Sequence, residues 1–402
     1  MPMETAGGTA MLDRRAVSAP HYTRAVNLIE TLGVEIGVRQ TGTPAADTAA
    51  EAVAAALREA GLEPRFHEFS LLGYEADEPL LEIDGERWEA GPCMYATPTE
   101  GIVEGTVRRI GSHSVGGFFP DADVFAVENA EGRELARLNM SPFGGAAIPF
   151  LTGTRQIAVG PTVFISGADA ERLRGLENTR ARVRVGGRFV PGCVGRNVIA
   201  ELRGESEEAI VVSAHYDSVW RGPGVIDNAT GVEGLRRVAE ELAGRGHVRS
   251  LLFVAFAAEE IGCVGSRQFV FDSSITGELD RIKACVNLDC IAHGKRFELL
   301  ASPRALTERL ERFATELGLQ DRYDLHVDAA GPGVDAFAFH EKGIPAATLC
   351  HFPYDEYHLP SERLELVDER RLTDSVELAT LLVESLLEQP VAPAPAPIPV
   401  DV

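Results

Sequence analysis

The second half of the chain alternates short apolar runs with longer segments of helical periodicity. Between the first two runs, Val232, Leu235, Ala239 and Leu242 recur at helical spacing and glycines follow them. Such alternation predicts an α/β domain with a mixed, mostly parallel sheet between layers of helices. The apolar runs of strand length are residues 209–216, 250–257, 284–292, 296–302 and 346–352.

The first half divides into a helical opening and a β-rich middle. An alanine-rich segment from Thr43 to Gly61 predicts a helix that ends at the glycine, and residues 63–72 predict a strand. After a hairpin expected at Asp84-Gly85, glycines and short β-like runs predict a small inserted domain. The expected parts are 1–85 (start of the main domain), 86–196 (insert), 197–389 (main domain) and 390–402 (an extended Pro/Ala-rich tail).

Composition narrows the class of partner. The net charge of −23 argues against nucleic acid and anionic membranes, while 45% hydrophobic and 25% charged residues are ordinary for a globular protein. The six cysteines lack paired metal spacing and do not form a disulfide framework. The opening residues lack the apolar stretch of a secretory signal, so we expect a cytoplasmic protein with no membrane span. The oligomeric state is open.

Acidic and imidazole side chains follow the predicted strands. In open α/β sheets, binding sites lie beyond the carboxyl ends of the strands, so these groups are expected at one edge. Five separate segments contribute to this edge. The residues are His215, Asp217, Asp227, Glu259, Glu260, Asp289 and His358.

Seven such groups would repel one another or remain unsatisfied without a central cation. Imidazole and carboxylate ligands without thiolate suit zinc or a related divalent ion. Five of these side chains, as ligands, are too few for two separate closed metal sites. They suffice for two metal ions if one carboxylate binds both. Open coordination positions would then remain for water and substrate, an arrangement suited to hydrolysis.

The remaining carboxylates can orient a metal ligand or transfer a proton. Asp217 stands two residues after His215, so on a strand it projects to the same side and can orient the imidazole. Of the adjacent pair Glu259 and Glu260, one is expected to face the metal. The other is expected to act as general base toward the metal-bound water.

Five stretches in order resemble the M28 family of zinc-dependent exopeptidases. They are "HYDS", "GVIDNATG", "AAEEIGCVGS", "NLDCIAHG" and "YHLPSE", and the opening region "RQTGTPAADTAAEAVAAALREAGL" is also similar. The resemblance covers residues of about 20–85 and 197–388. The inserted region resembles a protease-associated (PA) domain through "GGAAIPFLTG" and "GPTVFISGADAERLRGL".

The resemblance implies a role for each site residue. One zinc would be bound by His215, Asp227 and Asp289. The second zinc would be bound by Asp227, Glu260 and His358, so that Asp227 bridges the pair. Glu259 would be the general base and Asp217 the partner of the histidine. A cis peptide bond is implied at Asp227-Asn228.

The leading hypothesis is therefore a two-zinc aminopeptidase that acts on peptides or small amides through a metal-bridging hydroxide. Carboxypeptidase or amidase activity stays open, because Arg155, Arg221 and Arg267 cannot be placed relative to the metals from the sequence. A single-zinc acyltransferase resembling glutaminyl cyclases is a second alternative. A non-catalytic, receptor-like binding protein is a third.

Overall fold

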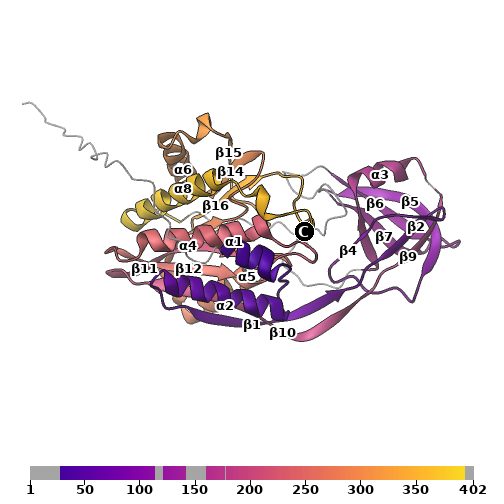
Figure 1. The fold of residues 1–402 in the computed structure, drawn as a ribbon, viewed down its shortest axis with the longest axis horizontal. Helices are drawn as coiled ribbons and strands as arrows, with labels where there is room; N and C mark the ends of the chain where they lie inside the picture. The colour runs from indigo at the N-terminus through magenta and orange to yellow at the C-terminus, as the bar shows by residue number, and fades with distance from the viewer. Residues whose placement is uncertain (1–27, 114–120, 142–159, 177, 394–402) are drawn as a thin grey trace, which may run out of the picture.

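The computed structural model describes residues 28–113, 121–141, 160–176 and 178–393. Two β-sheets organise these residues: the larger has an apolar core on each face, and the smaller has a separate core. In Figure 1 the helices α2, α4 and α8 cover the larger sheet, and α3 lies on the smaller sheet to the right.

The larger sheet has eight strands and is mixed. Pairing is parallel among β12, β11, β13 and β16, and also between β14 and β15; the other neighbouring pairs are antiparallel. This arrangement confirms the predicted α/β class with a mixed sheet. In spatial order the strands are β1 (Arg65–Ala76), β10 (Gly187–Leu202), β12 (Arg249–Phe256), β11 (Ser206–His215), β13 (Ile282–Leu288), β16 (Ala346–Phe352), β14 (Arg296–Ser302) and β15 (Asp324–Asp328).

Helices cover both faces of this sheet because the central strands are apolar on both sides. On β11, Ile210 and Val212 pack into one core, whereas Ala209 and Val211 pack into the other. The first core also takes side chains from α1 (Leu28–Glu30), η1 (Thr31–Ile36), α2 (Pro44–Glu59), α4 (Gly231–Leu242), α6 (Arg304–Glu316), η4 (Leu319–Asp321) and α8 (Glu369–Glu388). The second core takes side chains from α5 (Val264–Thr276) and α7 (Ala336–His340), while η3 (Glu278–Arg281) and η5 (Leu364–Leu366) are short turns.

Helix α2 forms where the sequence predicts it. Proline stands at its first position, and the Thr43 hydroxyl accepts a hydrogen bond from the Ala46 amide at 3.4 Å. The buried side chains Val53 and Leu57 then hold the helix against the core. Gly61 follows with a φ of 85°, a left-handed conformation that glycine adopts without strain.

The smaller sheet also has eight strands. A separate core lies on it, and α3 (Gly167–Arg174) packs there through Ala170 and Leu173. The hairpin between β2 and β3 turns at Asp84-Gly85 as predicted, so the proposed boundary at 85/86 falls within this hairpin. In spatial order the strands are β3 (Glu86–Arg87), β2 (Leu80–Ile83), β9 (Arg180–Arg184), β5 (Val103–His113), β6 (Ala122–Glu128), β7 (Glu134–Met140), β8 (Thr162–Ile165) and β4 (Gly91–Pro92).

The long antiparallel pair β1 and β10 connects the two sheets along the chain. Both strands belong to the larger sheet, and the chain enters the smaller sheet after β1 and returns through β10. Residues 65–76 and 187–202 therefore frame the insertion. The stretch "GGAAIPFLTG" (144–153) and most of the Pro/Ala-rich tail lie outside the described residues.

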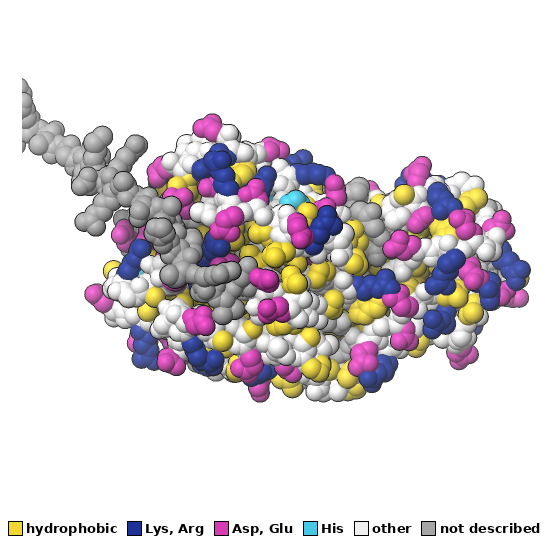
Figure 2. Space-filling view, in the orientation of Figure 1, with side chains coloured by type: hydrophobic (Ala, Val, Ile, Leu, Met, Phe, Trp, Pro, Cys, Tyr) yellow, Lys and Arg dark blue, Asp and Glu magenta, His cyan; other side chains and the backbone are white. Residues whose placement is uncertain are grey.

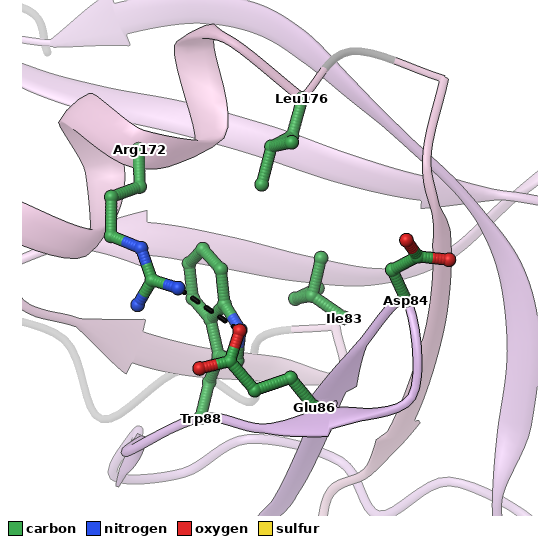
Figure 3. A pocket seen from close by; sticks show the side chains of 6 residues that line it. All are labelled: Ile83, Asp84, Glu86, Trp88, Arg172 and Leu176. Atoms are coloured by element: carbon green, nitrogen blue, oxygen red, sulfur yellow. Dashed lines mark hydrogen bonds and ion pairs between the residues drawn. The ribbon is translucent and has the colours of Figure 1, made fainter.

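A shallow pocket lies on the smaller sheet. Figure 3 shows Arg172 of α3 above Trp88, with its guanidinium 4.2 Å from the ring centroid. The same guanidinium pairs with Glu86 at 3.0 Å. A cation–π contact between α3 and the segment after β3 therefore forms part of the pocket wall.

The surface carries mixed charge. Figure 2 shows basic and acidic side chains interspersed over the visible face of the molecule. In the described part of the chain, no helix combines the length and hydropathy required to cross a membrane.

Candidate metal centre

The predicted ligands converge at one edge of the larger sheet. His215 ends β11, and Glu260 follows β12 in the turn before α5. Asp289 comes directly after β13, and His358 lies in the segment after β16. Asp227 lies in η2 (Val225–Thr230), between β11 and α4. All five side chains are buried.

Asp227 is the centre of this cluster. Its Oδ1 lies 3.0 Å from Nε2 of His215, and its Oδ2 lies 3.2 Å from Nε2 of His358. One carboxylate therefore faces two imidazoles that come from separate segments, with a different oxygen toward each.

The other two carboxylates flank the imidazoles. Asp289 Oδ1 lies 3.6 Å from Nε2 of His215, and Glu260 Oε2 lies 3.2 Å from Nε2 of His358. Ligand atoms of His215, Asp227 and Glu260 all lie within 4.8 Å of one another, close enough to share an ion.

Cysteine thiols also border the cluster, a contact that sequence reasoning did not predict. Cys290 has its Sγ 3.3 Å from Oδ1 of Asp289, and ligand atoms of Asp227, Asp289 and Cys290 form a second group within 4.8 Å. The Cys263 thiol donates to Oε1 of Glu259 at 3.3 Å. Both cysteines are buried and free of disulfides.

The turn that carries Glu259 and Glu260 is held through its backbone. Three successive amides, those of residues 257, 258 and 259, donate to Asn197 Oδ1 (2.9 Å), Thr41 Oγ1 (2.8 Å) and Asp217 Oδ1 (3.1 Å). Asn197 also donates to the Gly265 carbonyl at 2.9 Å, on the far side of the turn. Because each amide has a buried partner, the two glutamates leave β12 along a fixed path.

Asp217 lies beside the imidazole that it was predicted to orient. Its Oδ1 is 3.6 Å from Nδ1 of His215, a distance longer than a hydrogen bond. The observed hydrogen bond of this carboxylate is to the amide of Glu259. Its role toward the histidine stays a prediction.

Asn228 fixes the other side of the site. Its side chain donates to the Leu288 carbonyl at 2.9 Å and accepts from the amides of Gly231 (2.9 Å) and Cys290 (3.1 Å). The Asp227-Asn228 peptide bond is cis, as the resemblance implied. These bonds hold η2 against the end of β13, where Asp289 stands.

Burial and charge act in opposite directions on the imidazoles. Burial alone would lower the pKa of His215, but the carboxylates of Asp289, Asp217 and Asp227 raise it well above the usual value. The pKa of His358 is raised in the same way, chiefly by Glu260 and Asp227. The two imidazoles in turn hold the pKa of Asp227 well below its usual range, although burial acts against this.

The pKa values of the two adjacent glutamates, Glu259 and Glu260, are raised. Burial, followed by the charge of Asp227, raises the pKa of Glu260 to about 7. Burial raises the pKa of Glu259 well above its usual value, with Asp335, Glu260 and Asp289 adding to the effect. The site thus concentrates more negative charge than its own imidazoles balance.

The residues present fit a divalent cation. Among the described side chains, Glu260 Oε1 and His215 Nδ1 are buried without a hydrogen-bond partner. An unsatisfied carboxylate oxygen in a buried site is costly unless a cation or a donor compensates it. The donor set of two imidazoles and three carboxylates is one that zinc accepts.

His351, seven residues before His358, belongs to a different environment. Its ring stacks on Phe297 with 4.1 Å between centroids. Arg371 donates to its Nδ1 at 2.9 Å, and its Nε2 lies 3.3 Å from Oγ of Ser375. With Nδ1 accepting from an arginine, the ring is neutral and serves the packing of β16 against α8.

Taken together, the fold and the cluster define a class of protein: an α/β scaffold with a buried imidazole–carboxylate centre at the carboxyl edge of its sheet. Residues 197–383, a little under half of the chain, match the model for peptidase family M28. The match includes all seven predicted site residues.

Curated relatives are named as aminopeptidases. A probable lipoprotein aminopeptidase LpqL of Mycobacterium tuberculosis is 28% identical over 293 residues, which cover 66% of this chain and 56% of that protein. Aminopeptidase YwaD of Bacillus subtilis is 30% identical over 189 residues, covering 44% of this chain and 40% of that protein. The chain thus spans about half the length of these relatives.

Solved structures share the fold over most of the chain. The structure of BSAP, described as a zinc aminopeptidase from Bacillus subtilis, superposes with a TM-score of 0.68 at 22% identity. The superposition covers 89% of this chain and 93% of the other. At this identity, the likeness establishes the common fold.

The environment of His351 generates a pH prediction. Burial, with the charge of Arg371, lowers the pKa of His351 to about 3, whereas an unfolded chain has about 6.5. Between these values the unfolded state binds the proton and the folded state does not, so stability is lost as the pH falls. From pH 7 to pH 5 this group should reduce the free energy of unfolding by about 2 kcal/mol.

The check is urea unfolding at both pH values for the wild type and for His351→Gln. The variant should lose about 2 kcal/mol less than the wild type between pH 7 and pH 5. The partly exposed His326 of β15 supplies the control, and His326→Gln should follow the wild type. Equal pH sensitivity in wild type and His351→Gln would contradict the assignment.

Proposed function

We propose that the protein is a zinc-dependent aminopeptidase that releases the N-terminal residue of peptides at a two-ion centre bridged by Asp227. The observation that carries the proposal is the two-sided contact of Asp227 with His215 and His358. A carboxylate with one oxygen toward each imidazole is suited to bridge two ions. The names of the curated relatives and the family of residues 197–383 support the same activity.

The ligands divide into two groups around the bridge. His215 and Asp289 would join Asp227 at one ion, and Glu260 and His358 would join it at the other. The bound ions would polarise the scissile carbonyl and lower the pKa of water. Glu260, whose Oε1 has no partner among the described residues, would gain its missing contact in this way.

Glu259 is proposed as the general base. Its carboxylate takes a proton from the attacking water as the new C–O bond forms. When the C–N bond breaks, the electron pair stays on nitrogen, and Glu259 returns the proton to the leaving amine. Burial raises the pKa of this group, which makes its carboxylate a stronger base toward the attacking water. The Cys263 thiol and the bond from the Glu259 amide to Asp217 hold the group in place.

Charge favours a substrate with a free amino terminus. Two of the arginines that could bind an α-carboxylate already have carboxylate partners: Arg267 pairs with Glu341 at 2.6 Å, and Arg221 pairs with Glu78. Arg155 lies outside the described residues. The surplus of buried carboxylates at the site favours a substrate α-ammonium group over an α-carboxylate.

The proposal also covers the smaller sheet, the location of the protein and its partners. The smaller sheet is proposed to be a PA-like domain, on the resemblance stated above. A cytoplasmic location, peptide substrates and the absence of nucleic-acid or membrane partners are likewise proposed from the sequence. The single-zinc acyltransferase has weaker support, because five candidate ligands meet at one centre.

The role of Glu259 is tested by Glu259→Gln. The amide has the same size but accepts no proton at neutral pH, so kcat should fall about 10²–10⁴-fold or more. Zinc content, measured by plasma mass spectrometry, should match the wild type because Glu259 is not a proposed ligand.

Glu298 offers the matched control. It is a buried glutamate of β14, outside the metal centre, and Glu298→Gln should retain activity. Full activity in Glu259→Gln, with zinc retained, would rule out the general-base assignment.

The direction of hydrolysis is tested with three versions of one peptide: free, N-acetylated and C-terminally amidated. Loss of a buried ion pair costs about 2–5 kcal/mol, so N-acetylation should reduce kcat/KM roughly 30-fold or more. The C-terminal amide should be cleaved like the free peptide. The reverse pattern would favour a carboxypeptidase, and cyclisation of N-terminal glutamine would favour the acyltransferase.

A further inference from the structure

The segment Gly224–Asp227 reaches the metal centre between two buried side chains of opposite charge. Arg39, from the N-terminal region, contacts it on the carbonyl side, and Glu362, from the C-terminal region, contacts it on the amide side. Neither residue belongs to the predicted ligand set. Both lie in stretches whose other residues had been singled out, "RQTGTP" and "YHLPSE".

Arg39 is fully buried, and its guanidinium donates to carbonyl oxygens. In the loop after β11 it reaches the carbonyls of Tyr216 (2.5 Å), Pro223 (2.5 Å) and Gly224 (2.6 Å). The same guanidinium also reaches the carbonyl of Leu32, at 3.1 Å, and that of Gly37, also at 3.1 Å. A buried arginine that gathers carbonyls from two segments fixes one segment against the other.

Glu362 closes the opposite side. Its Oε1 accepts hydrogen bonds from the amides of Ile226 (2.8 Å) and Asp227 (2.7 Å) and from the hydroxyl of Tyr354 (3.2 Å). The side chain is 2% exposed. Since Glu362 stands four residues after His358, it connects the backbone of Asp227 to the segment that carries the second imidazole.

The local backbone is shaped for this arrangement. Gly224 has a φ of 61°, and a Cβ there would lie 2.5 Å from the Asp227 carbonyl oxygen and 2.7 Å from Nη2 of Arg39. Only glycine allows the loop to approach the guanidinium so closely. Arg39, Gly224 and Glu362 thus act on one short stretch of chain.

We propose that Arg39 and Glu362 are positioning residues, which clamp the Gly224–Asp227 segment and thereby hold the Asp227 carboxylate between His215 and His358. The inference rests on the proposed metal centre, since it assigns the clamp the task of preorganising the bridging ligand. Partners that orient a ligand in this way commonly account for 10–100-fold in metal affinity (a general, order-of-magnitude range).

The test is zinc affinity, measured in competition with a chromogenic chelator on the folded, full-length chain. Glu362→Ala removes the acceptor and should weaken zinc binding about 10–100-fold. Glu362→Gln keeps a side-chain oxygen at the same place and should restore most of that affinity. Arg39→Lys keeps the charge but has a single nitrogen, so it cannot span the carbonyls of both segments and should weaken binding about 10-fold or more.

Two matched controls separate positioning from general stability. Arg249 also donates to backbone carbonyls, those of Leu387 and Glu388, and Arg249→Lys should leave zinc affinity unchanged. Glu298→Ala removes a buried glutamate of β14 outside the centre and should also leave it unchanged.

Each outcome decides the proposal. Wild-type zinc affinity in both Glu362→Ala and Arg39→Lys, with only the unfolding midpoint lowered, would show that the two residues stabilise the fold alone. That result would overturn the proposal. Wild-type protein that takes up no zinc would instead overturn the proposed function, and the clamp with it. Weakened binding in these variants, with rescue in Glu362→Gln and unchanged controls, supports it.

Discussion

The contact of one carboxylate with two imidazoles is the interaction on which the site depends. Asp227 faces His215 through one oxygen and His358 through the other. Since one imidazole ends β11 and the other lies in the segment after β16, the position of Asp227 fixes how these two segments meet. Burial makes this arrangement costly unless a cation compensates it. The geometry, the excess of negative charge and the unpartnered Glu260 oxygen therefore all favour a bound cation at this site.

Hydrogen bonds between side chains and the backbone hold the loops that carry the proposed ligands. Asn197 and Thr41 bind the turn before Glu259, and Asn228 ties η2 to the end of β13. The sheet supplies the strand ends, while these polar side chains set the path of the chain beyond them. Such loops are irregular in sequence, yet their amides and carbonyls have defined partners.

Apolar patterning was sufficient to predict the α/β class and the five central strands, because strands buried on both faces read as continuous apolar runs. The proposed ligands could be found because they lie at the ends of those strands or in the loops that follow them. Arg39, Asn197 and Glu362 were missed because they act through backbone groups of distant segments, contacts that depend on tertiary structure. For Arg39 and Glu362 the position in the sequence was the available indication, because both stand inside stretches already singled out for other residues. The contact of Cys290 with Asp289 was missed because a cysteine in an apolar segment has the pattern of a core residue.

The central claim is that Asp227 bridges two ions. Crystals of the protein as purified, measured with X-rays just above and just below the zinc absorption edge, test it most directly. The account predicts two anomalous peaks per chain, one beside His215 and Asp289 and one beside Glu260 and His358, both in contact with Asp227. A single peak, or peaks away from Asp227, would contradict it.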